Sequence, residues 1–360
     1  MKIFNFFLFL STYLIIGCGH IEHEMAEESK YIVTFPAKRD TTIYHEYVSQ
    51  IHSIQHIELR VLEKGYLQYI YVDEGKYVKK GQLLFQILPI VYKAELQKSE
   101  ADLSLAKIEY ENTKALADGN VVSKNELSMA KARLEKAEAE LSLAKAHYDF
   151  TEIKAPFDGV IGRFNDVRLG SLVNEGELLT TLSDNSKMWV YFNVPESEYL
   201  DYATNPKSDS LLKVKLRLAN SKMFDEDGIV ETIEADFNNE TGNIAFRATF
   251  KNIKGILRNG ETGSILMPVK LDNVILIPQK ATFEILDKKF VFTVVGDKVV
   301  SKEIETGAEM PHLYEVRNGL NEKDKILVEG IRKVKNGDSI KYDLESFNEI
   351  VKNLNQLHAE

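Results

Sequence analysis

Cysteine, proline and tryptophan are scarce in this chain, which has one, eight and one of them in 360 residues. The single cysteine, Cys18, cannot form an intramolecular disulfide, so packing must hold any folded domain together. Positively charged residues are fewer than negatively charged ones, since 45 Lys and Arg against 55 Asp and Glu give a net charge of −10. This balance argues against a nucleic-acid partner, which requires a basic surface. With 44% hydrophobic and 28% charged residues, the composition is that of a folded soluble chain. A length of 360 residues predicts two to four domains.

Long apolar runs are missing except at the N-terminus. There Lys2 precedes an apolar stretch that ends in Ile15-Ile16-Gly17-Cys18. The stretch is shorter than the roughly 20 residues that span a bilayer, so we expect a signal peptide over residues 1–17. The last four residues resemble the lipobox of bacterial lipoproteins, which implies a diacylglycerol on the thiol of Cys18 and a tether over 18–30. An ordinary signal peptide that contains a cysteine is the alternative.

Catalytic motifs are absent as well. The sequence contains no glycine-rich phosphate loop, nucleophile elbow or Cys-His pairing. The glycines are spaced as strand turns, and the acidic residues Asp73, Glu74 and Asp158 flank such turns, where carboxylates serve as turn formers. We therefore predict that the chain is not an enzyme and holds no cofactor.

A heptad pattern marks the middle of the chain. Apolar or small residues recur at alternating spacings of three and four, and no Gly or Pro interrupts 124–151; they are Leu127, Ala130, Leu134, Ala137, Leu141, Ala144 and Tyr148. This spacing predicts a long helix with a coiled-coil seam. An internal repeat relates 100–113 to 138–151, with nine of fourteen positions identical. The repeat predicts a first helix with its own seam of Leu96, Ser99, Leu103, Ala106 and Tyr110.

A short connection separates the two predicted helices. Asp118-Gly119-Asn120 breaks the first helix, and Ser123 with Glu126 three residues later has the pattern of a capping box. A connection of this length makes the helices antiparallel. The flanking segments 54–90 and 151–184 instead alternate apolar and polar residues between turns and are weak copies of each other. We expect these two halves to close one small β-sandwich, with the helical hairpin inserted between them.

Taken together, these segments resemble the membrane fusion proteins, the periplasmic adaptor subunits of tripartite efflux systems (HlyD-like, RND type). The residues that carry the resemblance are 75–85 (GKYVKKGQLLF), 153–162 (IKAPFDGVIG), the heptad hairpin between them, 189–196, 274–278 and 316–330. The similarity covers nearly the whole chain after the signal peptide, in the expected order.

The resemblance implies an elongated, mainly β, multidomain fold with an inserted antiparallel coiled-coil hairpin over 91–150. A lipoyl-like domain split into 54–90 and 151–184 would carry the hairpin. A β-barrel domain would use 31–53 and 185–270, and a membrane-proximal β domain would use 271–345. We expect residues 346–360 to form a final helix, with Phe347, Ile350, Val351, Leu354 and Leu357 on one face.

Two site types that related proteins contain are not expected here. A lipoyl carrier needs a modifiable lysine at a hairpin apex, which the helical hairpin replaces here, so neither Lys80 nor Lys154 is expected to be modified. Some adaptors of copper and silver pumps bind metal near the N-terminus, mainly through methionines, whereas this chain has His20, His23, Glu24 and Met25 there. We interpret that cluster as a polar tether and His45, His52 and His56 as strand residues, and we predict no metal site.

The resemblance places function at the tip of the hairpin, which docks on a TolC-like channel in adaptors of the RND type. Leu116 and Ser123 match the Leu and Ser of the family's tip pattern, while Asn112, with Lys114 nearby, and Arg133 replace its Arg and Asp. The predicted docking residues are Leu116, Gly119, Asn120, Val122, Ser123 and Lys124. Ser123 could equally be no more than a helix cap.

The sequence therefore predicts a periplasmic adaptor, anchored by lipid to the membrane (the inner one in the preferred reading), that joins an inner-membrane RND transporter to a TolC-like outer-membrane channel. Copies of the chain, six by the resemblance, would pack together. The alternatives are an adaptor of an ABC-type exporter, an adaptor of a heavy-metal RND pump, and a solute-binding lipoprotein, which would have a pocket between two α/β lobes.

Overall fold

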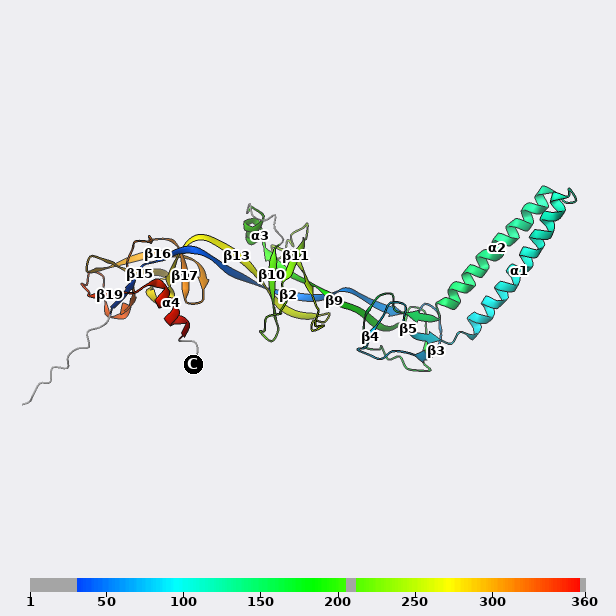
Figure 1. Ribbon diagram of the computed structural model, residues 1–360, viewed down its shortest axis with the longest axis horizontal. Coiled ribbons are helices and arrows are strands. Elements are labelled where there is room, and N and C mark those ends of the chain that lie inside the picture. The colour runs from blue at the N-terminus through cyan, green and yellow to red at the C-terminus, as the bar shows by residue number, and fades with distance from the viewer. Residues whose placement is uncertain (1–30, 205–211, 357–360) are drawn as a thin grey trace, which may run out of the picture. The chain divides into compact units, whose positions relative to one another are not determined.

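The computed structural model describes residues 31–204 and 212–356 and divides the chain into two compact units (Figure 1). The central unit comprises 44–268, and the terminal unit comprises 31–43 with the described residues from 269 onward. Two long strands, β2 (Ala37–Arg60) and β13 (Glu261–Pro278), each contribute residues to both units.

The helical hairpin belongs to the central unit and consists of α1 (Ile90–Asp118) and α2 (Lys124–Asp149). The two helices pack side by side. Their buried side chains are the small Ala106, Ala130, Ala137 and Ala144, and the larger seam residues are half-buried between them. Both predicted seams are confirmed, because the buried and half-buried residues are those at the predicted positions. The small side chains among them let the two helix backbones approach closely.

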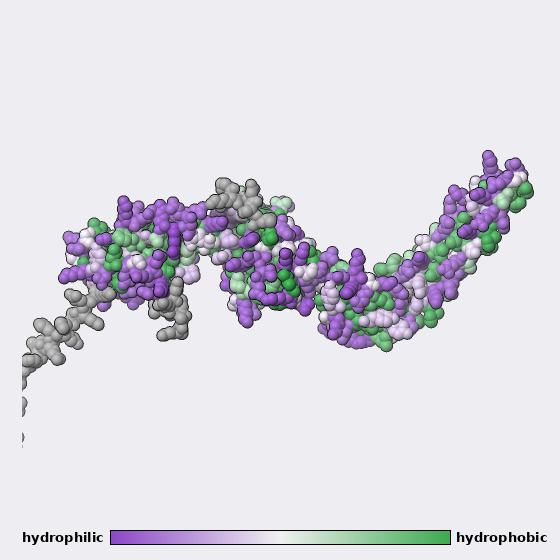
Figure 2. All heavy atoms as spheres, viewed as in Figure 1, coloured by the Kyte–Doolittle hydropathy of each residue, from purple (hydrophilic) through white to green (hydrophobic). Residues whose placement is uncertain are grey.

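Hydrophilic side chains cover most of the visible face of the hairpin, with scattered apolar ones among them (Figure 2). Ion pairs lie along the helix surface, including Lys131–Glu135 and Lys136–Glu140 at spacing i, i+4. Such exposed pairs contribute only about 0.3–0.5 kcal/mol each. The seam, rather than surface charge, therefore holds the helices together.

The two predicted halves of the small β-sandwich share one hydrophobic core, and we call them the split β module. Before the hairpin it has β3 (Gly65–Ile70), β4 (Tyr77–Val78) and β5 (Leu83–Ile87); after it come β6 (Glu152–Lys154), β7 (Gly159–Ile161), β8 (Leu172–Val173) and the start of β9 (Leu178–Pro195). Leu84 and Phe85 from the first half pack in one cluster with Ile153, Ile161 and Leu182 from the second. Strand pairing also joins the halves, since β5 pairs with β6, β3 with β8, and β4 with β7.

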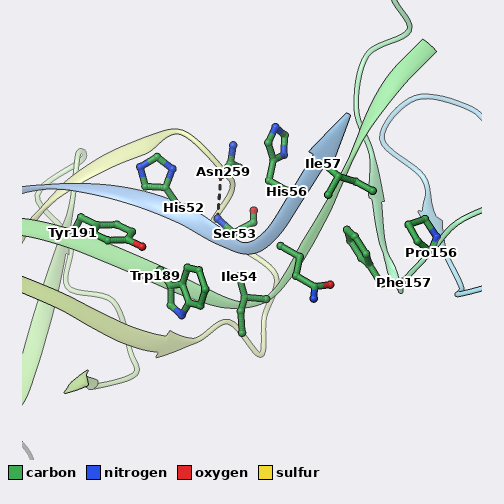
Figure 3. A pocket seen from close by; sticks show the side chains of 11 residues that line it. His52, Ser53, Ile54, His56, Ile57, Pro156, Phe157, Trp189, Tyr191 and Asn259 are labelled. Atoms are coloured by element: carbon green, nitrogen blue, oxygen red, sulfur yellow. Dashed lines mark hydrogen bonds between the residues drawn. The ribbon is translucent and has the colours of Figure 1, made fainter. Parts of the chain in front are cut away.

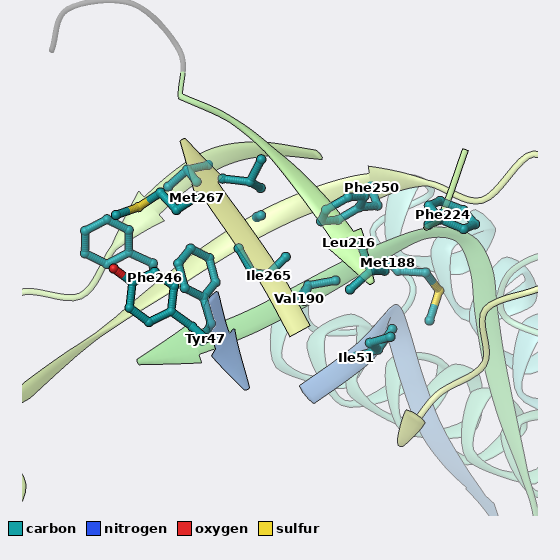
Figure 4. Packing of buried hydrophobic residues seen from close by; sticks show 14 of the residues in the cluster. Tyr47, Ile51, Met188, Val190, Leu216, Phe224, Phe246, Phe250, Ile265 and Met267 are labelled. Atoms are coloured by element: carbon teal, nitrogen blue, oxygen red, sulfur yellow. The ribbon is translucent and has the colours of Figure 1, made fainter. Parts of the chain in front are cut away.

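The barrel follows in the central unit. It combines β2, β9, β10 (Lys213–Leu218), β11 (Gly228–Ile233), β12 (Asn243–Lys251) and β13, with the short helix α3 (Glu196–Ala203). The strands pair in the order β13-β10-β11-β12-β9, and β2 pairs with both β9 and β13, which closes the ring. Alternate residues of each strand point into one core, which includes the ring of Phe192. Figure 4 shows Phe246 and Phe250 in the same core. Burying each such ring stabilises the barrel by about 2–3 kcal/mol.

The terminal unit is a second β domain. Its strands are β1 (Tyr31–Thr34), β14 (Thr282–Ile285), β15 (Lys288–Val295), β16 (Lys298–Met310), β17 (Leu313–Asn318), β18 (Ile326–Glu329), β19 (Tyr342–Leu344) and the end of β13, with two short 3-10 turns at Gln279–Ala281 and Ile331–Lys333. The closing helix α4 (Phe347–Gln356) buries Phe347 and Ile350. Val351 and Leu354 pack beside them, as predicted, while Leu357 lies outside the described residues.

The predicted use of the first strand was wrong. We expected residues 31–53 to complete the barrel, but β1 lies in the terminal unit, where it pairs antiparallel with β18 and parallel with β19. Val33 is fully buried in that unit beside Leu327. An alternating pattern predicts which residues of a strand face a core but not which sheet the strand joins. Of the two strands in this segment, only β2 continues into the barrel.

The seam yields the first prediction. Ala137→Glu places a carboxylate at a buried seam position and should destabilise the hairpin by about 2 kcal/mol, because a buried charge without a partner is among the costliest substitutions. The matched control is Ala132→Glu, the same change at an exposed position of the same helix. Thermal unfolding followed by circular dichroism at the helix band should show a lower transition temperature for Ala137→Glu only. Equal transitions would mean that the seam does not hold the helices.

Candidate docking surface

The connection between α1 and α2 is a compact turn over Gly119 to Ser123. The backbone N–H groups of Asn120 and Val121 donate to the carbonyls of Ala117 and Leu116, at 2.9 and 2.8 Å. Asn120 adopts the left-handed conformation with φ 57°, which asparagine tolerates better than other residues that carry a Cβ atom. Gly119 has φ −82°, a conformation open to any residue. Asn120, rather than the neighbouring glycine, therefore makes the left-handed turn.

Ser123 caps the second helix, as the sequence predicted. Its Oγ accepts a hydrogen bond from the backbone N–H of Glu126 at 3.1 Å. An N-cap serine is worth about 1 kcal/mol over alanine, and the carboxylate of Glu126 in the first turn also favours the positive end of the helix dipole. The Ser123 side chain remains exposed, so capping does not bury it.

We define the tip surface as Val121 together with the six predicted docking residues, all of which the structure brings into this turn and the adjoining helix ends. Leu116 is 46% exposed and Val121 is 70% exposed, while Val122 is half-buried. Gly119, Asn120, Ser123 and Lys124 are exposed. The sequence prediction missed Val121, although two successive valines between two polar helix ends were a visible signal.

Two departures from the family's tip pattern can now be located. Asn112 is exposed on α1. Arg133, at the position of the pattern's Asp, forms an ion pair with Glu109 across the hairpin. This guanidinium therefore joins the two helices below the tip.

The base of the hairpin is fixed to the β2–β3 connection of the split β module. The hydroxyl of Tyr92 donates to the carbonyl of Lys64 at 2.9 Å, and His147 Nδ1 lies 2.5 Å from the carboxylate of Glu63. The hydrogen bond with Glu63 raises the pKa of His147, and the charges of Glu95 and Glu175 act in the same direction. One contact from each helix thus fixes the hairpin to the module.

Three further histidines each contact a neighbouring side chain. His45 contacts Glu198 at 2.6 Å, His56 contacts Ser183 at 2.7 Å, and His52 packs edge-on against Tyr191. Within residues 31–204 and 212–356 no group of three or more His, Cys, Asp or Glu side chains could hold a metal ion. The earlier cluster of His20, His23 and Met25 lies outside these ranges, as does Cys18.

Glu198 of helix α3 accepts a second contact in the barrel. The hydroxyl of Tyr47 donates to its carboxylate, and burial together with this hydrogen bond raises the pKa of Tyr47. The contact ties α3 to β2, so it has a structural role. Of the two lysines considered for lipoate, Lys154 pairs its side-chain ammonium with Glu152 at 2.6 Å, whereas the contact of Lys80 is made by its backbone N–H, which donates to Asp158 at 2.7 Å.

Three family models match the chain, each over one domain. The α-helical hairpin domain of RND membrane fusion proteins matches 89–154, and the β-barrel domain of the same proteins matches 187–271. The C-terminal permuted SH3-like domain of YknX matches 274–342. The chain belongs to the membrane fusion proteins, the periplasmic adaptors of efflux pumps. Adaptors of this family are structural linkers, so the chain is not an enzyme.

Curated relatives of this adaptor include two named as efflux pump periplasmic linkers and one named as a multidrug resistance protein. The efflux pump periplasmic linker BepD of Brucella suis is 26% identical over 82% of this chain and 80% of its own length. The multidrug/solvent efflux pump periplasmic linker protein MepA of Pseudomonas putida is 28% identical over 91% and 88%. The multidrug resistance protein MexA of Pseudomonas aeruginosa is 26% identical over 93% and 90%.

Solved structures confirm the adaptor fold. A MacA–MexA chimera that carries the Pseudomonas aeruginosa MexA hairpin aligns with a TM-score of 0.62 at 23% identity, covering 82% of this chain and 99% of the chimera. A putative efflux transporter from Bacteroides eggerthii aligns with a TM-score of 0.54 at 21% identity, covering 85% of this chain and 96% of that protein.

No helix within the described ranges is both long and apolar enough to cross a bilayer.

The contact between His147 and Glu63 yields a pH prediction. Because the pKa of His147 is raised in the folded state, its ion pair stabilises the hairpin base fully below the ordinary pKa of about 6.5. That contribution is lost as the pH rises through the raised value. The midpoint temperatures of thermal unfolding of the unaltered protein and of His147→Gln should therefore differ most near pH 5.5 and least near pH 8.5. Glu63→Gln should abolish the pH dependence of this difference, and a difference that grows with pH would contradict the pairing.

Proposed function

We propose that this adaptor joins an inner-membrane RND transporter to a TolC-like outer-membrane channel and thereby completes an envelope-spanning efflux path. The observation that carries the proposal is the hairpin, which matches the RND hairpin model and ends in the exposed tip surface. The names of BepD, MepA and MexA support an efflux role. The barrel match to RND adaptors favours this transporter class.

The tip surface suits docking onto the helical end of a channel. Leu116 and Val121 offer two apolar side chains, each worth on the order of 1–2 kcal/mol if an interface buries it fully. The exposed Asn120 and Ser123 side chains offer hydrogen bonds beside them. A small apolar centre with a polar rim is the usual anatomy of a specific protein interface.

Anchoring and self-association complete the proposal. A diacylglycerol on Cys18, with the further chain that lipoproteins carry, would hold the adaptor firmly at the membrane surface, whereas one acyl chain binds only marginally. Confinement to that surface raises the local concentration of copies, which favours assembly of a weakly associating subunit into a ring of about six.

Docking through the tip can be tested by Ser123→Arg. The bulky charged side chain should abolish export, measured as drug resistance of a strain that depends on this pump, while the protein still reaches the envelope at normal abundance. Loss of the cap should cost only about 1 kcal/mol, so the fold survives. The control is Ser142→Arg, the same substitution at an exposed position of the same helix. Unchanged resistance with Ser123→Arg would exclude docking through this turn.

Lipidation can be tested at Cys18, the only cysteine of the chain. Cys18→Ala should remove labelling by radioactive palmitate and shift the protein from the detergent phase to the aqueous phase in a two-phase partition. Ser11→Ala, within the same apolar stretch, should change neither result. Retained palmitate on Cys18→Ala would refute the predicted anchor.

A further inference from the structure

An open pocket of about 780 Å³ lies on the central unit (Figure 3). None of the residues that line it belongs to the tip surface. Its walls come from the β2 segment His52–Ile57, from Trp189 and Tyr191 of β9, from Pro156 and Phe157 between β6 and β7, and from Asn259. The volume falls within the range of about 300–1,000 Å³ that small-molecule sites occupy. Nothing in the adaptor role requires a pocket here.

Strand pairing explains why large side chains gather at one wall. His52 lies opposite Trp189 in the antiparallel pair of β2 and β9. Their neighbours Ile51, Met188 and Val190 point into the barrel core and are fully buried, so His52 and Trp189 must point outward. Tyr191 follows two residues later on the same outer face.

Contacts hold these rings in place before any ligand arrives. The imidazole of His52 meets Tyr191 edge-on with centroids 5.6 Å apart, and the guanidinium of Arg247 lies 4.5 Å from the ring centre of Trp189. Aromatic side chains that are already ordered lose little further conformational entropy on binding. The wall is therefore suited to stacking or edge contact with another planar ring.

The split β module supplies the facing wall. Phe157 packs partly against the core of that module, and the preceding Ala155 is buried in it. Hydrogen bonds between Ala155 and the Gly81–Gln82 turn, at 2.7 and 3.0 Å, fix this connection. The pocket thus has ordered apolar surfaces on both sides.

The polar groups at the rim indicate which ligands fit. They are the imidazoles of His52 and His56, the amides of Gln55 and Asn259, and Ser53, whose N–H donates to Asn259 at 3.0 Å. Among the described residues that line the pocket there is no carboxylate. A cationic ligand would therefore gain no opposite charge there, whereas imidazoles and amides can donate to neutral or anionic oxygen atoms.

We propose that this pocket is a binding site for a planar aromatic small molecule that is neutral or anionic. The ring would lie against Trp189 and Tyr191 on one side and Phe157 on the other, with its polar group toward His52, His56 and Gln55. This inference does not depend on docking or on the transporter class.

Trp189 provides a direct test because it is the only tryptophan of the chain. Nitroaromatic compounds quench tryptophan emission on contact, so three probes with the same ring can be titrated into the full-length protein in a tryptophan-free detergent. These are 4-nitrobenzenesulfonate (anionic), 4-nitrobenzyl alcohol (neutral) and 4-nitrobenzyltrimethylammonium (cationic). Quenching should saturate for the anionic and neutral probes. The cationic probe should bind with an affinity at least five-fold lower.

Two variants assign the quenching to the pocket. Gln55→Glu adds a carboxylate to the rim with a side chain of the same size. It should lower the affinity for the anionic probe at least five-fold and change the affinity for the neutral probe less than two-fold. Gln97→Glu, the same change on an exposed face of α1, should alter neither. Phe157→Ala should weaken both probes, and unfolding curves of each variant would confirm that it folds.

Three results would overturn the proposal. Quenching that rises linearly with the concentration of every probe would mean collision without binding. An unchanged affinity for the anionic probe in Gln55→Glu would mean that the probe binds elsewhere. Tightest binding of the cationic probe to the unaltered protein would contradict the preference for neutral or anionic ligands. Emission of Trp189 that shifts with protein concentration in the absence of any probe would mean that a second copy covers the pocket.

Discussion

The shared core of the split β module is the constraint on which the central unit depends. Leu84 and Phe85 lie before the hairpin and Ile153, Ile161 and Leu182 after it, yet they form one cluster. Closing a flexible loop of about 60 residues would cost on the order of 4 kcal/mol in chain entropy. The hairpin removes much of this cost, because two antiparallel helices of similar length return the chain to the point where it left.

The same constraint explains the features at the base of the hairpin. Tyr92 near the start of α1 and His147 near the end of α2 contact Lys64 and Glu63, two consecutive residues of one connection. Contacts at both helix ends resist rotation of the hairpin about a single point of attachment. Stability of the seam and stability of the module are coupled through this base, so a defect in one should weaken the other.

The sequence predicted the hairpin more accurately than any other part of the chain. A heptad seam is a local signal, and the small residues Ala130, Ala137 and Ala144 are buried as their spacing requires. The cap at Ser123 is equally local. Strand assignment is not local, which is why residues 31–34 were placed in the barrel although they pair with β18 and β19.

The features that the sequence did not reveal share a physical cause. The pair of His147 with Glu63 joins residues 84 positions apart, and the pocket combines side chains from four separate segments. No periodicity relates such positions, because each depends on how strands far apart in the chain pair. Trp189 and His52 were visible as residues but not as neighbours. Only the antiparallel register of β2 and β9 brings them together.

The location of charge near the tip bears on how a partner is recognised. Arg133 occupies the place where the family's tip pattern has an acid, but its guanidinium pairs with Glu109 on the facing helix. Each charge therefore already has a partner, and an exposed pair of this kind contributes little to stability. In the proposed docking, recognition at this tip would rest mainly on the apolar Leu116 and Val121 and on hydrogen bonds from the turn, with Lys124 as the one charged residue of the tip surface. A contact of that composition depends weakly on salt, because screening acts on charges and not on buried apolar area.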